Sequence, residues 1–138
     1  MSAVTTTAPV SGGFDSAAAL RGLAGFGAVG LGLSALGLAT GISPPCPWRM
    51  LTGTLCPLCG ATHVGMALLQ GDLVGAWAAN PFVLIGLLVL TLLGSFWTLE
   101  TLGGAAVRPP RWLRLSANRW WLVVGVGAVA FALWRNLA

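Results

Sequence analysis

Charged side chains are scarce in this sequence: they make up only 7 % of its 138 residues, and lysine is absent. A soluble domain normally carries about 25 % charged residues, so the composition argues against a water-soluble globule. Hydrophobic residues reach 57 %, and they form runs long enough to cross a bilayer. At this length the chain has room for one domain. We therefore predict an all-α integral membrane protein.

Cysteine and histidine are also few, with three and one residues. Three cysteines are too sparse for a disulfide-rich scaffold, which needs more than about 8–10 %. The single histidine, His63, has no serine and second acid at a recognisable triad spacing, so hydrolase chemistry is unsupported. The formal charge of +4 comes from arginines that bracket apolar runs. That pattern is typical of membrane topology, and we expect no nucleic-acid partner.

Three apolar segments predict membrane-crossing helices at about residues 20–42, 81–102 and 119–135, since one crossing needs about 20 apolar residues. Residues 1–19 are predicted to be a flexible tail, and residues 20–138 a single transmembrane domain. The uninterrupted apolar part of the third segment has 15 residues and spans only about 22 Å. We therefore expect its flanking arginines to extend towards water.

Residues 43–80 lie between the first two crossings and are broken by proline and glycine. Three prolines near the start remove backbone donors, so we expect no regular helix over residues 43–54. Thr62 is a candidate N-cap for a short helix that ends near Gln70, and Asp72 for a second one. Both helices are too short to span, so we predict interfacial or re-entrant helices at the membrane surface.

The end of this segment carries a signal for the start of a helix. In Asn80-Pro81, asparagine can cap the helix and proline suits its first position. We therefore predict that the second crossing begins here and is not the continuation of a longer, kinked helix.

The arginines are distributed unequally between the two predicted loops. Segment 43–80 holds Arg49 alone. Four arginines lie in or just after the loop at residues 103–118: Arg108, Arg111, Arg114 and Arg119. We predict a multi-pass protein of the plasma membrane. Because positively charged loops stay in the cytoplasm, its N-terminus and loop 103–118 would be cytoplasmic, and segment 43–80 would face outward.

The outward segment contains Cys56-Pro57-Leu58-Cys59, with Cys46 upstream and His63 downstream. A C-x-x-C spacing lets two thiols close a small ring, and the outer side of the membrane permits such chemistry. If Cys59 lies just before a helix, the helix dipole favours its thiolate. Cys46 could then act as a resolving partner in disulfide exchange. Cys46, Cys56 and Cys59 are therefore candidate redox thiols.

Two other roles stay open for the same residues. Cys46, Cys56, Cys59 and His63 supply four ligands, the number that a tetrahedral zinc site uses, and copper(I) also accepts thiolates. This set predicts a metal-binding or metal-chaperone module. Alternatively, Cys46 forms a static disulfide with one member of the pair, and no cofactor is present.

An ordered series of short motifs resembles a family of small bacterial membrane proteins, domain of unknown function 2752. The series is Cys46, Thr52-Gly53, Cys56-Pro57-Leu58-Cys59-Gly60-Ala61-Thr62, Gly71-Asp72 and Asn80-Pro81. The family more often has arginine where this sequence has His63, and an arginine does not ligate metals as histidine does. The resemblance therefore weakens the four-ligand metal site. It implies a membrane class and topology, and no particular activity.

The first crossing is rich in small residues. Gly37 and Gly41 are four residues apart, as are Ala24, Ala28 and Gly32 in turn. Such spacing lines one helix face and lets a neighbouring backbone approach closely. It predicts tight packing, either within the chain, with a second copy or with a membrane partner. An accessory subunit of a larger membrane complex is therefore a further alternative to a thiol function.

Overall fold

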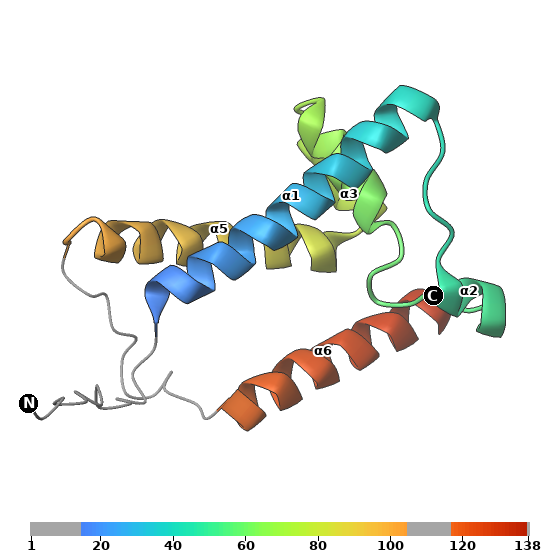
Figure 1. Cartoon of the computed structure of the whole chain (residues 1–138). Coiled ribbons are helices and arrows are strands. Elements are labelled where there is room, and N and C mark those ends of the chain that lie inside the picture. Colours follow the sequence, from blue (N-terminus) through green and yellow to red (C-terminus); the bar gives the residue numbers. More distant parts are fainter. Residues whose placement is uncertain (1–14, 105–116, 138) are drawn as a thin grey trace, which may run out of the picture.

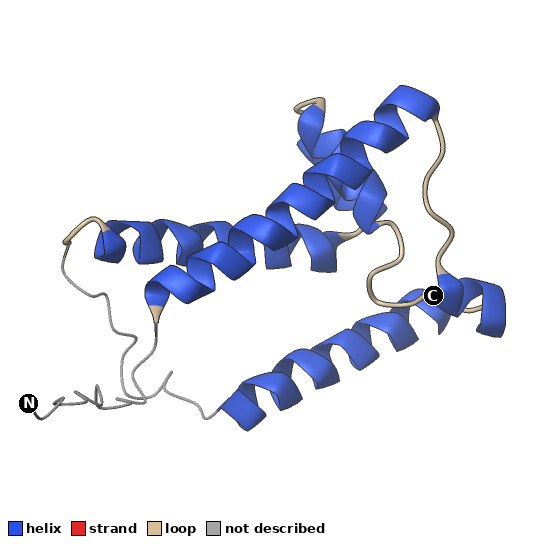
Figure 2. Ribbon diagram, viewed as in Figure 1, coloured by secondary structure: helices blue, strands red, loops and turns tan. Residues whose placement is uncertain are grey.

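The computed structural model describes residues 15–104 and 117–137, which form six helices and no strand (Figure 1; Figure 2 shows the same view by secondary structure). Three of the helices are each long and apolar enough to cross a membrane: α1, α5 and α6. The predicted all-α membrane fold with three spanning helices is therefore confirmed. In chain order the elements are α1 (Ser16–Thr40), α2 (Pro47–Thr52), α3 (Ala61–Leu69), α4 (Leu73–Ala79), α5 (Pro81–Thr101) and α6 (Ala117–Leu137).

The long helices differ in how they meet the rest of the chain. α1 packs along α5 and also contacts α3, whereas α6 runs apart from α1 and α5 in Figure 1. α6 joins the other helices near its C-terminal end. There Phe131 stacks on Phe82, at the start of α5, with 5.4 Å between ring centroids. The cysteine-bearing segment lies at this same end of the molecule.

α1 begins four residues before the predicted start at residue 20. The Oδ1 atom of Asp15 accepts hydrogen bonds from the backbone N–H groups of Ala17 (3.0 Å) and Ala18 (3.1 Å). Such a cap satisfies donors that the first turn leaves free, and it allows the helix to start early. Residues 16–19 of the predicted tail are therefore helical, and residues 1–14 lie outside the described residues.

α6 is longer than the predicted segment 119–135. Its 21 residues span about 30 Å at 1.5 Å per residue, which matches the hydrocarbon core of a bilayer. The helix continues through Arg119 and Arg135, because arginine is a good helix former whose charged end can reach water. The apolar run alone therefore underestimated the span. Most of the predicted loop at 103–118 lies outside the described residues.

Two expectations for the segment between the first crossings were wrong. Pro47 begins the short helix α2, where the prolines had predicted no regular helix. Proline is tolerated at a first helical position, because that position needs no N–H and its φ suits proline. α3 begins at Ala61, so Thr62 lies inside the helix, and the cap position belongs to Gly60.

Two predicted caps are confirmed. The Asp72 side chain accepts a hydrogen bond of 2.8 Å from the N–H of Gly75 and begins α4. The Asn80 side chain accepts one of 3.1 Å from the N–H of Val83 and begins α5, with Pro81 at its first position. The second crossing therefore starts at the predicted residue.

The best-buried apolar residues lie where the hairpin of α3 and α4 packs on α5. Val64 of α3 and Ala76 of α4 are completely buried, and Leu84 of α5 is nearly so. Gly71 permits the tight turn between the two short helices, with a φ of 74° that favours glycine. The hairpin is thus fixed on α5, and it holds the start of α3, where the cysteine loop ends.

α1 and α3 approach each other closely through small residues. Gly65 of α3 faces the hydroxyl of Ser34, and Gly37 of α1 faces the sulfur of Met66, which would lie 2.8 Å from a Cβ at position 37. Ser34 and Gly37 are both buried. Gly37, from the predicted pair of glycines, therefore packs within the chain. Association of this helix with a second copy or another membrane protein stays a prediction.

We predict that Gly65→Ala lowers the thermal unfolding temperature, because the new Cβ collides with the Ser34 hydroxyl. Overpacking of this kind costs about 1–3 kcal/mol. Gly25→Ala is the matched control, since a Cβ at this α1 position meets nothing within 4 Å and alanine favours the helix. Melting curves of both variants in detergent provide the measurement. Equal unfolding temperatures would contradict the close packing of α1 on α3.

Candidate functional site

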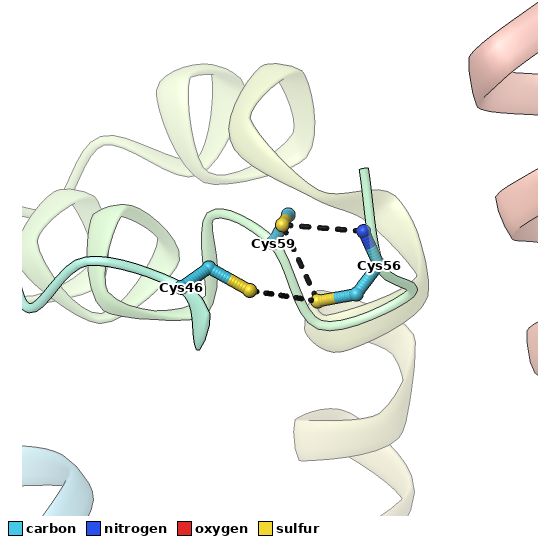
Figure 3. A group of neighbouring side chains, drawn as sticks. All are labelled: Cys46, Cys56 and Cys59. Atoms are coloured by element: carbon cyan, nitrogen blue, oxygen red, sulfur yellow. Dashed lines mark hydrogen bonds between the residues drawn. The ribbon is translucent and has the colours of Figure 1, made fainter. Parts of the chain in front are cut away.

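The three cysteine sulfurs meet at one point, although Cys46 comes from a different part of the segment (Figure 3). The Cys56 Sγ lies 3.4 Å from the Cys46 Sγ and 3.3 Å from the Cys59 Sγ. All three sulfurs lie within 4.8 Å of one another, and all three residues are free thiols. The predicted clustering is therefore confirmed, with Cys56 in contact with both neighbours. The predicted static disulfide is not formed in this structure.

The C-x-x-C sequence folds into a tight loop that leads directly into α3. The Cys59 N–H donates to the Cys56 carbonyl over 3.0 Å, and the Cys56 N–H points at the Cys59 Sγ over 3.3 Å. Gly60 then takes a φ of 92°, a conformation that favours glycine. A Cβ at Gly60 would also lie 3.0 Å from the Ala79 carbonyl. Glycine here lets the loop turn into α3 while it lies against the end of α4.

Asn80 holds this loop through side-chain hydrogen bonds. Its side chain is completely buried, and its Nδ2 atom donates to the carbonyls of Pro57 (2.8 Å) and Cys59 (2.9 Å). Its Oδ1 atom accepts the N–H of Val83. One amide therefore satisfies three backbone groups and ties the cysteine loop to the start of α5.

Two residues at the C-terminal end of α6 also bind this loop. Arg135 donates from Nη1 to the Cys59 carbonyl and from Nη2 to the Ala79 carbonyl, both over 2.9 Å. Asn136 pairs with the backbone of Leu55: it accepts from its N–H and donates to its carbonyl, again over 2.9 Å each. Among the residues that the structure describes, these four bonds attach α6 to the cysteine loop and to the end of α4. We call Arg135 and Asn136 the α6 clamp.

The α6 clamp is the part of the site that the sequence did not indicate. Arg135 was expected only to extend towards water at the end of an apolar helix. The sequence did contain one signal for this attachment, because Asn136 directly follows Arg135. An asparagine offers both a donor and an acceptor to a backbone.

Two of the thiols differ in acidity. The backbone N–H of Arg49, together with hydrogen bonds from Cys56 and Cys59, lowers the pKa of Cys46 to about 7, from an ordinary value of about 8.5. Burial, reinforced by the neighbouring Cys59 and Cys46, raises the pKa of Cys56 to about 11. Near neutral pH, Cys46 is therefore partly thiolate, whereas Cys56 keeps its proton.

His63 lies outside the group of converging sulfurs. It is exposed, and its ring nitrogens are not among the ligand atoms that gather within 4.8 Å. It instead lines a pocket beside Cys59, together with Arg49 and Arg135. Of the four predicted metal ligands, the structure brings together the three cysteines alone.

Residues 46–94 match the family described as "Protein of unknown function (DUF2752)". The match confirms the family resemblance over these residues, which run from Cys46 into α5 and cover less than half of the chain. The cysteine loop, the α3–α4 hairpin and Asn80 lie inside the DUF2752 match, and the α6 clamp lies outside it. No curated protein and no solved structure matches the chain.

We predict that Asn80→Ala destabilises the protein by about 2–4 kcal/mol, through the lost cap and two lost bonds to the loop. Asn80→Ser separates these effects, because serine can still cap α5 but is too short to reach both loop carbonyls. It should therefore restore about 1 kcal/mol of stability and still leave the loop loose. Unfolding in detergent measures the first effect, and the alkylation rate of Cys59 measures the second. A wild-type alkylation rate in Asn80→Ser would contradict the role of Asn80 in holding the loop.

Proposed function

We propose that this protein is a membrane-bound centre for thiol–disulfide exchange, facing outward from the plasma membrane. One observation carries the proposal: the Cys56 Sγ is in contact with both other sulfurs, 3.4 Å from the Cys46 Sγ and 3.3 Å from the Cys59 Sγ. A disulfide bond has a sulfur–sulfur distance of about 2.05 Å. Cys56 can therefore bond to either neighbour after a movement of about 1.3 Å.

The distribution of acidity and exposure assigns the order of the steps. Cys46 is partly exposed, and the pKa of about 7 makes it the natural attacking thiolate. It attacks a substrate disulfide, forms a mixed disulfide and releases the first substrate thiol. Cys56 then loses its proton and attacks the Cys46 sulfur, which forms the Cys46–Cys56 disulfide and releases the second substrate thiol.

A last step moves the disulfide inward. The buried Cys59 loses its proton and attacks the Cys56 sulfur, so that the Cys56–Cys59 bond forms and Cys46 leaves as a thiolate. Low-pKa thiols leave readily, which favours the departure of Cys46. In sum, one substrate disulfide is reduced to two thiols while two protein thiols become one disulfide. The same steps in reverse transfer the disulfide to a substrate dithiol.

We predict that oxidised glutathione leaves a stable mixed disulfide on Cys46 in the double variant Cys56→Ser/Cys59→Ser, because no neighbouring thiol can then resolve it. Cys59→Ser should instead form the Cys46–Cys56 bond, and the wild type should pass this bond on to Cys56–Cys59. Peptide mapping by mass spectrometry distinguishes the two disulfides. The initial rate should rise with pH and be half-maximal near pH 7, because only the Cys46 thiolate attacks and its pKa is about 7.

Two results would overturn the exchange function. One is a disulfide in the purified wild type that neither glutathione nor dithiothreitol changes, which indicates a static bridge. The other is equal accumulation of the mixed disulfide in the wild type and in Cys56→Ser/Cys59→Ser.

A second candidate function is the binding of one soft metal ion. It is favoured by the convergence of three sulfurs within 4.8 Å, because thiolates are the ligands that copper(I) and zinc accept. With His63 outside the group, the protein supplies three ligands. A metal function predicts one ion per chain after purification without chelator. The ion should be lost in each Cys→Ser variant and kept in His63→Gln.

The outward orientation predicts opposite labelling of two exposed leucines at opposite ends of the long helices. Leu51 in α2 and Leu102 after α5 are 87 % and 79 % exposed, so cysteine at either position can react. In a background with the three native cysteines changed to serine, Leu51→Cys should react with a membrane-impermeant maleimide in intact cells. Leu102→Cys should react only after the membrane is opened. The reverse pattern would contradict both the orientation and an oxidising environment for the thiols.

A further inference from the structure

A pocket of about 320 Å³ lies beside the cysteine loop. Its volume falls in the range of about 300–1,000 Å³ that is usual for small-molecule sites. Three basic side chains line it, and each comes from a different helix: Arg49 from α2, His63 from α3 and Arg135 from α6. We call these three residues the basic pocket. Segments far apart in the sequence thus bring positive charge to one place.

No acidic residue balances this charge within the pocket. None of the three acids in the sequence, Asp15, Asp72 and Glu100, is among the residues that line it. Asp15 and Asp72 instead cap the starts of α1 and α4. Two arginines remain charged at any physiological pH. The basic pocket therefore has a positive potential that attracts anions.

The basic side chains also have donors to spare. Among the residues that the structure describes, neither the Arg49 guanidinium nor the His63 ring has a hydrogen-bond or ion-pair partner. Arg135 uses two donors for the carbonyls of Cys59 and Ala79, and a guanidinium has five N–H groups. Three N–H groups of Arg135 are thus left for a ligand.

We propose that the basic pocket binds a phosphate group, either of a phospholipid headgroup or of a soluble phosphate. Arginine forks match the oxygens of phosphate and bind them with charge-assisted hydrogen bonds. Donors that approach from three helices suit a tetrahedral anion with several oxygens. The proposal does not depend on the exchange function, although Cys59 lines the pocket and its carbonyl accepts a hydrogen bond from Arg135. Through this residue, a bound phosphate is linked to the carbonyl of Cys59 and so to the cysteine loop.

The test uses the full chain in a phosphate-free maltoside detergent. The first arm follows the unfolding temperature as inorganic phosphate is added, with chloride at equal ionic strength as the reference. The second arm measures binding of phosphatidylglycerol by native mass spectrometry. A response in both arms indicates a general phosphate site, and a response to phosphatidylglycerol alone indicates a lipid headgroup site.

The variants are Arg49→Gln and His63→Gln, which remove donors that have no structural partner and so should not disturb folding. Arg21→Gln is the matched control, because Arg21 lies near the start of α1, donates to the carbonyl of Ala17 and does not line the pocket. We expect Arg49→Gln to weaken binding about tenfold or more, since a hydrogen bond to a charged group contributes about 1.5–3 kcal/mol. Arg21→Gln should bind as the wild type does.

The double variant Arg49→Gln/His63→Gln should lose binding entirely. Wild-type affinity in this double variant, or no response of the wild type to either ligand, overturns the proposal. Because neither arm reads the cysteines, this result is independent of the exchange experiment. A protein with all three cysteines changed to serine should still bind phosphate if its ligand-free unfolding temperature is unchanged.

Discussion

The buried amide of Asn80 is the interaction on which the rest of this structure depends. It begins α5, a membrane-spanning helix, and holds the two carbonyls that shape the cysteine loop. A buried amide is stable only when its donors and acceptor are all used, and here each of them binds backbone. The same side chain therefore starts a helix and fixes a reactive loop, so neither can shift without the other. This link gives three thiols a defined arrangement in a loop that would otherwise be loose.

The thiol centre is built asymmetrically. Cys46 comes from the start of α2 and is partly exposed, whereas Cys59 is buried next to α3. Cys46 and Cys56 also differ in pKa. A backbone N–H favours the thiolate of Cys46, whereas burial disfavours the thiolate of Cys56. Cys46 and Cys56 are half-buried and Cys59 is buried, so the three thiols of the cluster differ in their access to solvent. The basic pocket lies beside the buried member, Cys59.

Features that depend on a few neighbouring residues could be predicted from the sequence. Asn80-Pro81 and Asp72 start helices because the cap and the N–H that it accepts are only three residues apart. Thr62 was assigned the wrong role because Gly60, which has no side chain to read, can also begin a helix when a tight turn precedes it.

The α6 clamp could not be found in this way. Its partners lie 56, 76 and 81 residues earlier in the chain. An arginine near the end of an apolar helix looks the same in the sequence whether it binds lipid or a loop. The sequence also could not show that Cys46 approaches Cys56 and Cys59 while His63 does not. This depends on how α2 and α3 are placed in space.

The distance along the chain between the loop and its clamp also matters during biosynthesis. A ribosome adds about 5–20 residues per second, so roughly 4–15 s separate the synthesis of Cys59 from that of Arg135, 76 residues later. During this interval the cysteine loop is held by Asn80 at most, and its thiols are open to any oxidant on the side to which they are delivered. Insertion of α6 then closes the loop. The cysteine loop therefore gains its full set of hydrogen bonds only after the last residues of α6 have been made.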